Sequence, residues 1–129
     1  MRLDTLETFI TGTPPPGHGG RYFIFVRLTT ACGITGIGEI YSASFAPEIV
    51  CRMAEDMFAR YLEGRAPDRI EHFWRRAHGS GFTHRPDTSV QGVVSGLEMA
   101  CWDIVGKALD RPVYALLGGL VNERLRTYT

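Results

Sequence analysis

The spacing of apolar residues divides the chain into an early part with a period of two and a later part with a helical period. Residues 21–30 (RYFIFVRLTT) alternate and carry apolar side chains on both faces, which predicts a central strand. Residues 2–11 and 34–42 predict one strand on either side of it. Because only a short turn joins the second strand to the third, with no helical segment between them, the sequence predicts an antiparallel three-stranded meander.

Helical segments follow at residues 47–64 and 68–79, the second with a capping-box-like start at Asp68 and Glu71. A long helix is predicted from residue 89, where apolar residues recur in steps of three and four. Its apolar stripe is Val90, Val94, Leu97, Cys101, Ile104 and Ala108. Asp110-Arg111-Pro112 ends this helix, and a short helix follows before Gly118-Gly119. Sheet and helices are therefore segregated along the chain, which predicts an α+β fold: a three-stranded meander followed by a helical bundle.

Polar and small residues of the long helix carry further information. Gly92 and Gly96 lie one turn apart and weaken the helix locally, which predicts that another backbone packs closely there. A second side of the helix carries Met99 and Trp102 together with Gln91, Ser95 and Glu98. Asp103 and Lys107 are spaced for an ion pair along the helix, and we interpret Glu98 and Asp103 as capping or packing partners.

Composition narrows the class of protein. The chain has 129 residues, enough for one domain, and its 14 basic and 14 acidic residues give no net charge. That balance gives no electrostatic reason to expect nucleic acid or a membrane as partner, and no apolar run approaches the roughly 20 residues of a membrane span. No signal peptide is recognised at the N-terminus. The three cysteines, an odd number without metal-site spacing, are interpreted as reduced, buried thiols in the cytoplasm.

Two stretches resemble a known family. They are SGLEMACWDIVGKALDRPVYALLGG at residues 95–119 and FIFVRLTTACGITGIGEIY at residues 23–41. Both resemble the N-terminal capping domain of the mandelate racemase/muconate lactonizing enzyme branch of the enolase superfamily. The resemblance covers nearly the whole chain but only the first third of such an enzyme. It implies that residues 1–124 form the capping domain and that LRTYT, residues 125–129, starts a (β/α)8 barrel, for which about 250 residues are needed.

The resemblance also implies a reaction class. Such enzymes abstract the proton alpha to a carboxylate and hold the resulting enediolate on Mg²⁺. A Lys-x-Lys base is excluded within this segment because Lys107 is its one lysine. His72 and His78, six residues apart on a helix, do not face each other as metal ligands. We therefore expect no catalytic residue and no metal ligand here: the Mg²⁺ is bound by the barrel, and residues 1–129 alone are inactive.

In the family, two loops of the capping domain close over the mouth of the barrel and select the substrate. They match Thr13–Arg21 and Ile40–Phe45, and a third loop at residues 79–88 is rich in glycine and polar groups. The candidate substrate-binding residues are His18, Arg21, Tyr41 and Ser42, with His84 and Arg85 from the third loop. The alternative is that these side chains are solvated loop residues without a ligand.

The resemblance favours one activity without excluding its neighbours. The stretch SGFTHRPDTSVQGVVSGLEMACWD, residues 80–103, looks closer to sugar-acid dehydratases than to cycloisomerases. The expected partner is therefore a small-molecule carboxylate, a sugar acid, and the family implies a homo-oligomer. A racemase or epimerase and a cycloisomerase of the same superfamily are the alternatives in the same class. A non-catalytic, stand-alone domain is the alternative from a different class.

Overall fold

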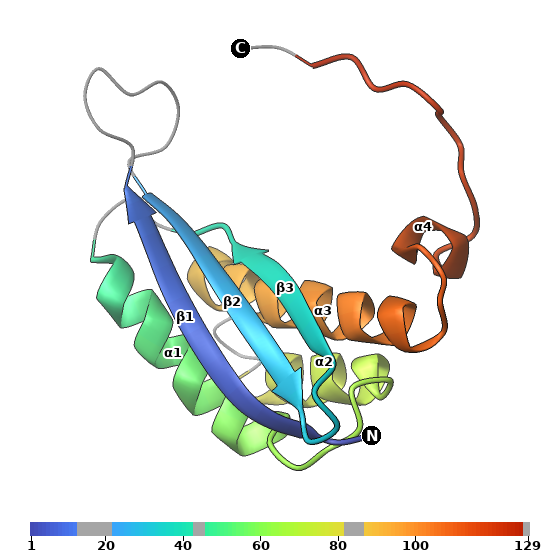
Figure 1. The fold of residues 1–129 in the computed structure, drawn as a ribbon. Helices are drawn as coiled ribbons and strands as arrows, with labels where there is room; N and C mark the ends of the chain where they lie inside the picture. Colours follow the sequence, from blue (N-terminus) through green and yellow to red (C-terminus); the bar gives the residue numbers. More distant parts are fainter. Residues whose placement is uncertain (13–21, 43–45, 82–86, 128–129) are drawn as a thin grey trace.

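A three-stranded antiparallel sheet lies against a layer of helices (Figure 1). The computed structural model describes residues 1–12, 22–42, 46–81 and 87–127. The strands are β1 (Leu3–Gly12), β2 (Tyr22–Thr30) and β3 (Thr35–Ile40). Their order is β1-β2-β3, so the predicted meander with a central second strand is confirmed. The tight turn between β2 and β3 contains Gly33, whose positive φ of 87° favours glycine.

Helices α1 and α3 cover one face of the sheet, and α2 packs beneath them (Figure 1). The helices are α1 (Pro47–Tyr61), α2 (Ile70–Gly79), α3 (Thr88–Ala108) and α4 (Val113–Leu116). The predicted α+β fold, with its long and short helices near the C-terminus, is confirmed. The predicted start of α2 is wrong: the helix begins at Ile70, and the N-cap residue before it, Arg69, makes no side-chain capping hydrogen bond.

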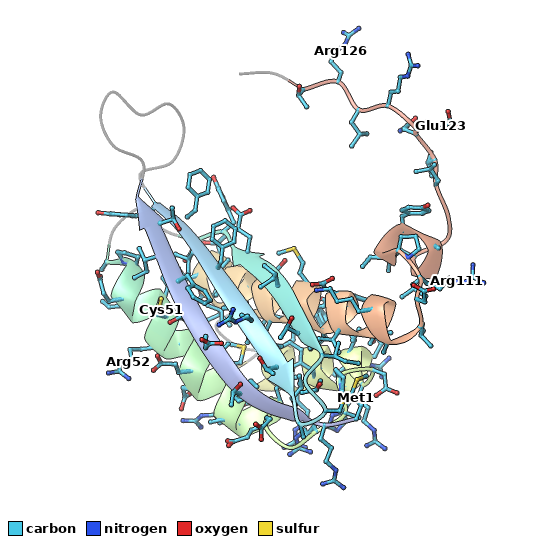
Figure 2. The ribbon with its side chains drawn as sticks, in the orientation of Figure 1. Met1, Cys51, Arg52, Arg111, Glu123 and Arg126 are labelled. Carbon is cyan, nitrogen blue, oxygen red and sulfur yellow. The ribbon has the colours of Figure 1, made fainter. Side chains whose placement is uncertain are left out.

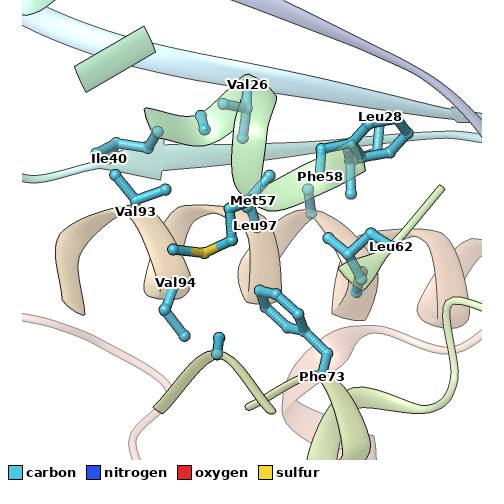
Figure 3. Close-up of a cluster of buried hydrophobic side chains, with 14 of the residues drawn as sticks. Val26, Leu28, Ile40, Met57, Phe58, Leu62, Phe73, Val93, Val94 and Leu97 are labelled. Carbon is cyan, nitrogen blue, oxygen red and sulfur yellow. The ribbon is translucent and has the colours of Figure 1, made fainter. Parts of the chain in front are cut away.

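The core lies between the sheet and the helices (Figure 3). Val26 and Leu28 of β2 point into it, where they meet Phe58 of α1 and Leu97 of α3. Phe73 of α2 closes the core from below and is almost completely buried. The alternation in the sequence therefore predicts correctly which side chains of β2 point into the core.

The outer face of the sheet is not covered by the described residues, although the sequence indicated two apolar faces. Phe9, Phe23 and Ile37 on this face are 40%, 38% and 46% exposed. A paired charge crosses it: Arg27 donates two hydrogen bonds to the Glu7 carboxylate, at 2.7 and 2.8 Å. The guanidinium of Arg27 also lies over the Phe9 ring, 5.3 Å from its centroid, as a cation–π contact.

Helix α3 packs on β3 through glycines on both elements. A Cβ atom at Gly36 would collide with the carbonyl oxygen of Ala100, and one at Gly38 with the carbonyl oxygen of Gly96. The close backbone approach predicted from the glycines is therefore confirmed. No side chain larger than hydrogen fits at these positions of β3 without a shift of the backbone.

Two side chains of α3 also form hydrogen bonds with backbone groups at the free edge of β3. Asp103 accepts a hydrogen bond from the Ile37 N–H at 2.9 Å, and Lys107 donates one to the Thr35 carbonyl at 2.8 Å. The two side chains form the predicted ion pair at 2.7 Å. These contacts confirm Asp103 as a packing partner and occupy two backbone groups of an edge that could otherwise pair with another strand.

The cysteines are all free, but only two are buried as predicted. Cys51 and Cys101 lie in the core, and burial raises the pKa of the Cys101 thiol to about 12. Cys32 is exposed because it lies in the turn between β2 and β3. There the Thr30 hydroxyl, 3.3 Å from the sulfur, lowers the pKa of the Cys32 thiol.

The C-terminal segment leaves the body of the domain after α4 (Figure 1). Glu123 and Arg126 lie on this extended segment (Figure 2). Residues 120–127 form neither helix nor strand, and residues 128–129 lie outside the described residues. The strand predicted from residue 125 has no partner strand within the described residues, so the domain boundary at residue 124 stays a prediction. Within the described residues, no helix has the length and apolar character needed to cross a membrane.

Candidate functional site

A hollow of about 760 Å³ opens between the end of β3 and the N-terminal half of α3. We call it the β3–α3 hollow. Its lining residues are Glu39, Tyr41, Ser42, Thr88, Ser89, Gln91, Gly92, Ser95 and Met99. The volume is in the range of small-molecule sites.

Two local features of the sequence shape the hollow. The Asp87 carboxylate caps α3 by accepting hydrogen bonds from the Ser89 and Val90 N–H groups, at 3.0 and 3.2 Å. Gly92, one turn further along, lets the backbone of Tyr41 pass close to the helix, since a Cβ atom there would collide with the Tyr41 carbonyl oxygen. The chain at Tyr41, directly after β3, is therefore seated on the first turns of α3.

The lining favours an uncharged, hydroxylated ligand. It offers the carboxylate of Glu39, the amide of Gln91 and several hydroxyl groups, and no lysine, arginine or histidine among the described lining residues. The Ser42 hydroxyl is buried and has no hydrogen-bond partner in the part of the chain that the structure describes. A buried hydroxyl without a partner is uncommon in a folded protein.

Two of the six predicted substrate-binding residues line the hollow. Tyr41 is 87% exposed, and Ser42 lies beside it, half-buried. The other four, His18, Arg21, His84 and Arg85, lie outside the described residues. The contact with substrate stays a prediction for all six.

The anchor points of the three predicted loops converge on this end of the domain. Gly12 pairs with Tyr22, and Ile24 pairs with Ile40. The C-terminal ends of β1 and β3 and the N-terminal end of β2 therefore lie at the same end of the sheet. Helix α3 begins there too, since Thr88 lines the same hollow as Tyr41. The topology therefore gathers the chain segments on either side of the loops around one site.

Residues that line the hollow from α3 were not among the predicted site residues. Gln91, Ser95 and Met99 are spaced by four, which places them on one face of the helix. That spacing was visible in the sequence as a second side of the helix. Glu98 and Trp102 of that side lie apart from the hollow, where the Trp102 ring N–H donates to the Glu98 carboxylate at 3.4 Å.

Gln91 has a partner outside the hollow. Its side-chain Nε2 lies 3.1 Å from Nδ1 of His78, at the end of α2. The His78 ring is stacked on Trp74, with 4.7 Å between ring centroids and 7° between ring planes. His72, the other histidine of α2, is exposed. Within residues 1–12, 22–42, 46–81 and 87–127, no three His, Cys, Asp or Glu side chains are grouped so that they could hold a metal ion.

Comparison with known proteins places these features in context. The family model described as Mandelate racemase / muconate lactonizing enzyme, N-terminal domain, matches residues 18–118. The D-galactonate dehydratase of Xanthomonas campestris pv. campestris (strain B100) is 38% identical over 128 residues, which cover 99% of this chain and 31% of that enzyme. The chain therefore spans about a third of the length of the curated relatives it matches.

Solved structures share the same fold. One from Labrenzia alexandrii DFL-11, described as a mandelate racemase/muconate lactonizing enzyme, is 63% identical with a TM-score of 0.92. The match covers 98% of this chain and 32% of that one. The 3,6-anhydro-D-galactonate cycloisomerase of Zobellia galactanivorans is 26% identical with a TM-score of 0.80, over 95% of this chain and 33% of the cycloisomerase.

Proposed function

The chain belongs to the N-terminal domain family of mandelate racemases and muconate lactonizing enzymes, and we propose that it caps the active site of a longer enzyme that dehydrates a sugar acid. The relatives support this assignment, since the curated relative named above is a D-galactonate dehydratase. In the proposal, the remaining two thirds of the enzyme form the barrel, and this domain selects the substrate.

The β3–α3 hollow carries the assignment of this domain to substrate selection. A sugar acid has one carboxylate and several hydroxyl groups. The hollow presents Glu39, which would repel the carboxylate, and hydroxyl-bearing residues such as Ser89 and Ser95, which would pair with substrate hydroxyls. The hydroxylated end of the substrate therefore fits the hollow, with Tyr41 and Ser42 as contact residues.

The Mg²⁺ that the family implies does not fit the described residues of this domain, because no group of metal-binding side chains is present among them. The proposal therefore places the metal in the remainder of the enzyme, and no step of the reaction is assigned to residues of this chain. Closure of the domain over the barrel would exclude water and complete the pocket.

A first experiment tests whether this domain is one part of a larger protein. Intact-mass spectrometry of the native polypeptide should give roughly three times the 14.4 kDa of this chain, since the chain spans 31% of its dehydratase relative. A native mass of 14.4 kDa would leave no room for a barrel and would support a stand-alone, non-catalytic domain instead.

The second experiment tests the reaction. The full-length enzyme is incubated with Mg²⁺ and a panel of hexonates and hexarates, and the product is analysed by mass spectrometry. Dehydration removes the hydrogen alpha to the carboxylate and the hydroxyl of the next carbon, so the product is lighter by one water. Chelation of the metal should abolish turnover. Failure of every sugar acid to lose water would refute the proposed function.

A cycloisomerase is the second candidate, because the fold matches a 3,6-anhydro-D-galactonate cycloisomerase over nearly the whole domain. Cycloisomerisation leaves the mass of the substrate unchanged, so the same product analysis separates the two reactions. A cytoplasmic location and a homo-oligomeric assembly remain part of the proposal. The free Cys51 and Cys101 thiols agree with a reducing compartment.

A further inference from the structure

Gln91 connects the β3–α3 hollow to a side chain outside it. The residue lies in the first turns of α3, where its backbone N–H donates to the Asp87 carbonyl at 2.9 Å. Its side chain lines the hollow and is half-buried, while Nε2 lies 3.1 Å from Nδ1 of His78. The same amide group therefore faces both the hollow and the end of α2.

The contact directs one side of the amide at His78. With Nε2 of Gln91 as the donor, His78 Nδ1 is the acceptor, and the tautomer that fits this contact carries its ring proton on Nε2. One N–H of Gln91 is then committed to His78. Within the part of the chain that the structure describes, the carbonyl oxygen and the second N–H of the amide have no hydrogen-bond partner, and the proposal assigns them to a ligand in the hollow.

His78 is itself held in place. Its ring stacks on Trp74, one helical turn earlier in α2, with nearly parallel planes. The stack limits rotation of the imidazole and so keeps Nδ1 directed at Gln91. Few rotamers of a glutamine side chain satisfy such a fixed acceptor, which lowers the entropy that ligand binding would otherwise cost.

We propose that Trp74 and His78 act as a positioning pair, which holds the Gln91 amide as a hydrogen-bonding group for a substrate hydroxyl in the hollow. This inference rests on the proposed function, since it names the residue of the hollow that reads the hydroxylated end of the substrate. His78 is a positioning residue and does not touch the substrate.

The test uses the full-length enzyme and a set of variants on both sides of the contact. His78→Phe keeps an aromatic ring on Trp74 but removes the acceptor. His78→Asn restores an acceptor, because the side-chain oxygen of asparagine lies near the position of Nδ1. Gln91→Met removes the amide, and the double variant His78→Phe/Gln91→Met closes the cycle. His72→Phe, on an exposed position of the same helix, is the matched control.

We expect His78→Phe and Gln91→Met each to raise KM about tenfold, the effect of one lost hydrogen bond. The value of kcat should change less, because a hydrogen bond to a remote hydroxyl contributes equally to ground and transition states. The double variant should resemble either single variant, and His78→Asn should lie close to the wild type. Thermal unfolding of all variants reports any loss of stability separately from KM.

Three results would overturn the proposal: a wild-type KM for His78→Phe, an His78→Asn variant as impaired as His78→Phe, or effects that multiply in the double variant. The last two would assign the contact a structural role only. If the wild-type enzyme converts no sugar acid, the proposed function fails separately. The same variants are then ranked by KM on the carboxylate that the enzyme does convert, and that ranking decides on the positioning pair.

Discussion

The packing of α3 and the shape of the β3–α3 hollow both depend on the absence of a side chain at Gly92. A methyl group at this position would collide with the Tyr41 carbonyl oxygen and would lie 3.1 Å from the Tyr41 carbonyl carbon. Neither is the flexible end of a side chain, so the backbone between β3 and α1 has to move. We predict that Gly92→Ala displaces the two residues that line the hollow from this loop, Tyr41 and Ser42.

The size of the effect follows from the contact. Non-bonded carbon atoms pack at about 3.5–4.0 Å, so the Tyr41 peptide must retreat by roughly 1 Å. Overpacking of this kind costs about 1–3 kcal/mol of stability, and alanine in a helix recovers up to about 1 kcal/mol relative to glycine. The net loss of stability should therefore be about 1 kcal/mol. A displacement of about 1 Å at a substrate-positioning residue lowers catalytic efficiency by up to about 100-fold.

Two other glycines separate the loss of activity from the loss of stability. Gly106→Ala places a methyl group 2.8 Å from the Arg111 carbonyl oxygen, at the C-terminal end of α3, and should cost stability with kcat/KM unchanged. Gly79→Ala, at the last residue of α2, meets no atom of the described residues within 4 Å, so it should leave kcat/KM unchanged and should not lower stability. Steady-state kinetics and thermal unfolding of the full-length enzyme measure both. A Gly92→Ala enzyme with wild-type kcat/KM would show that Tyr41 and Ser42 do not position the substrate.

Two further predictions concern the edge of β3 and the thiols. Asp103→Ala removes the acceptor of the Ile37 N–H and should cost about 1–2 kcal/mol, with faster hydrogen exchange at that amide by mass spectrometry. Asp56→Ala, which breaks only the exposed pair with Arg60, should cost less than about 0.5 kcal/mol, and equal losses would contradict this account of the edge. A thiol reagent should label Cys32 at a lower pH than a free thiol, because reaction requires the thiolate and the Cys32 pKa is lowered. Cys101, with a pKa of about 12, should stay unlabelled in the folded protein until the pH approaches that value, and labelling of Cys101 at neutral pH would refute its burial.

The strands and helices were predictable because the buried residues recur with the same period as the apolar residues in the sequence. Ile24, Val26 and Leu28 alternate along β2 and all point into the core. Gly92 and Gly96 of α3 were also sufficient to predict close packing of another backbone, although not which residue each glycine meets. That pairing depends on the register between strand and helix, which one sequence does not contain.

Local signals failed where tertiary structure competes with them. Asp68 and Glu71 have the spacing of a capping box, yet α2 starts at Ile70, because the chain before it forms a turn with buried Pro67. The two apolar faces of β2 correctly predicted a central strand, but Phe23 on the outer face is 38% exposed. A pattern shows that a side chain is apolar without showing what covers it.

The hollow was only partly predictable, for a reason that lies in α3 itself. Gln91, Ser95 and Met99 can be grouped from their spacing alone, but Glu39 joins them only because β3 runs along the helix in one register. That register is set by Gly92 and its counterparts, which are also the residues that seat the helix on the sheet.

Helix α3 therefore has three faces, and each lies in a different environment. Leu97 and its neighbours face the core, the glycines face β3, and the polar residues spaced by four face the hollow. Substitutions on the third face can change the ligand without changing the fold, because Ser95 and Met99 are exposed and make few demands on packing. Substitutions on the face with Gly92 and Gly96 change both the ligand and the packing of the fold. Variation in substrate among enzymes built on this domain should therefore be found at the positions of Gln91, Ser95 and Met99, while those of Gly92 and Gly96 stay glycine.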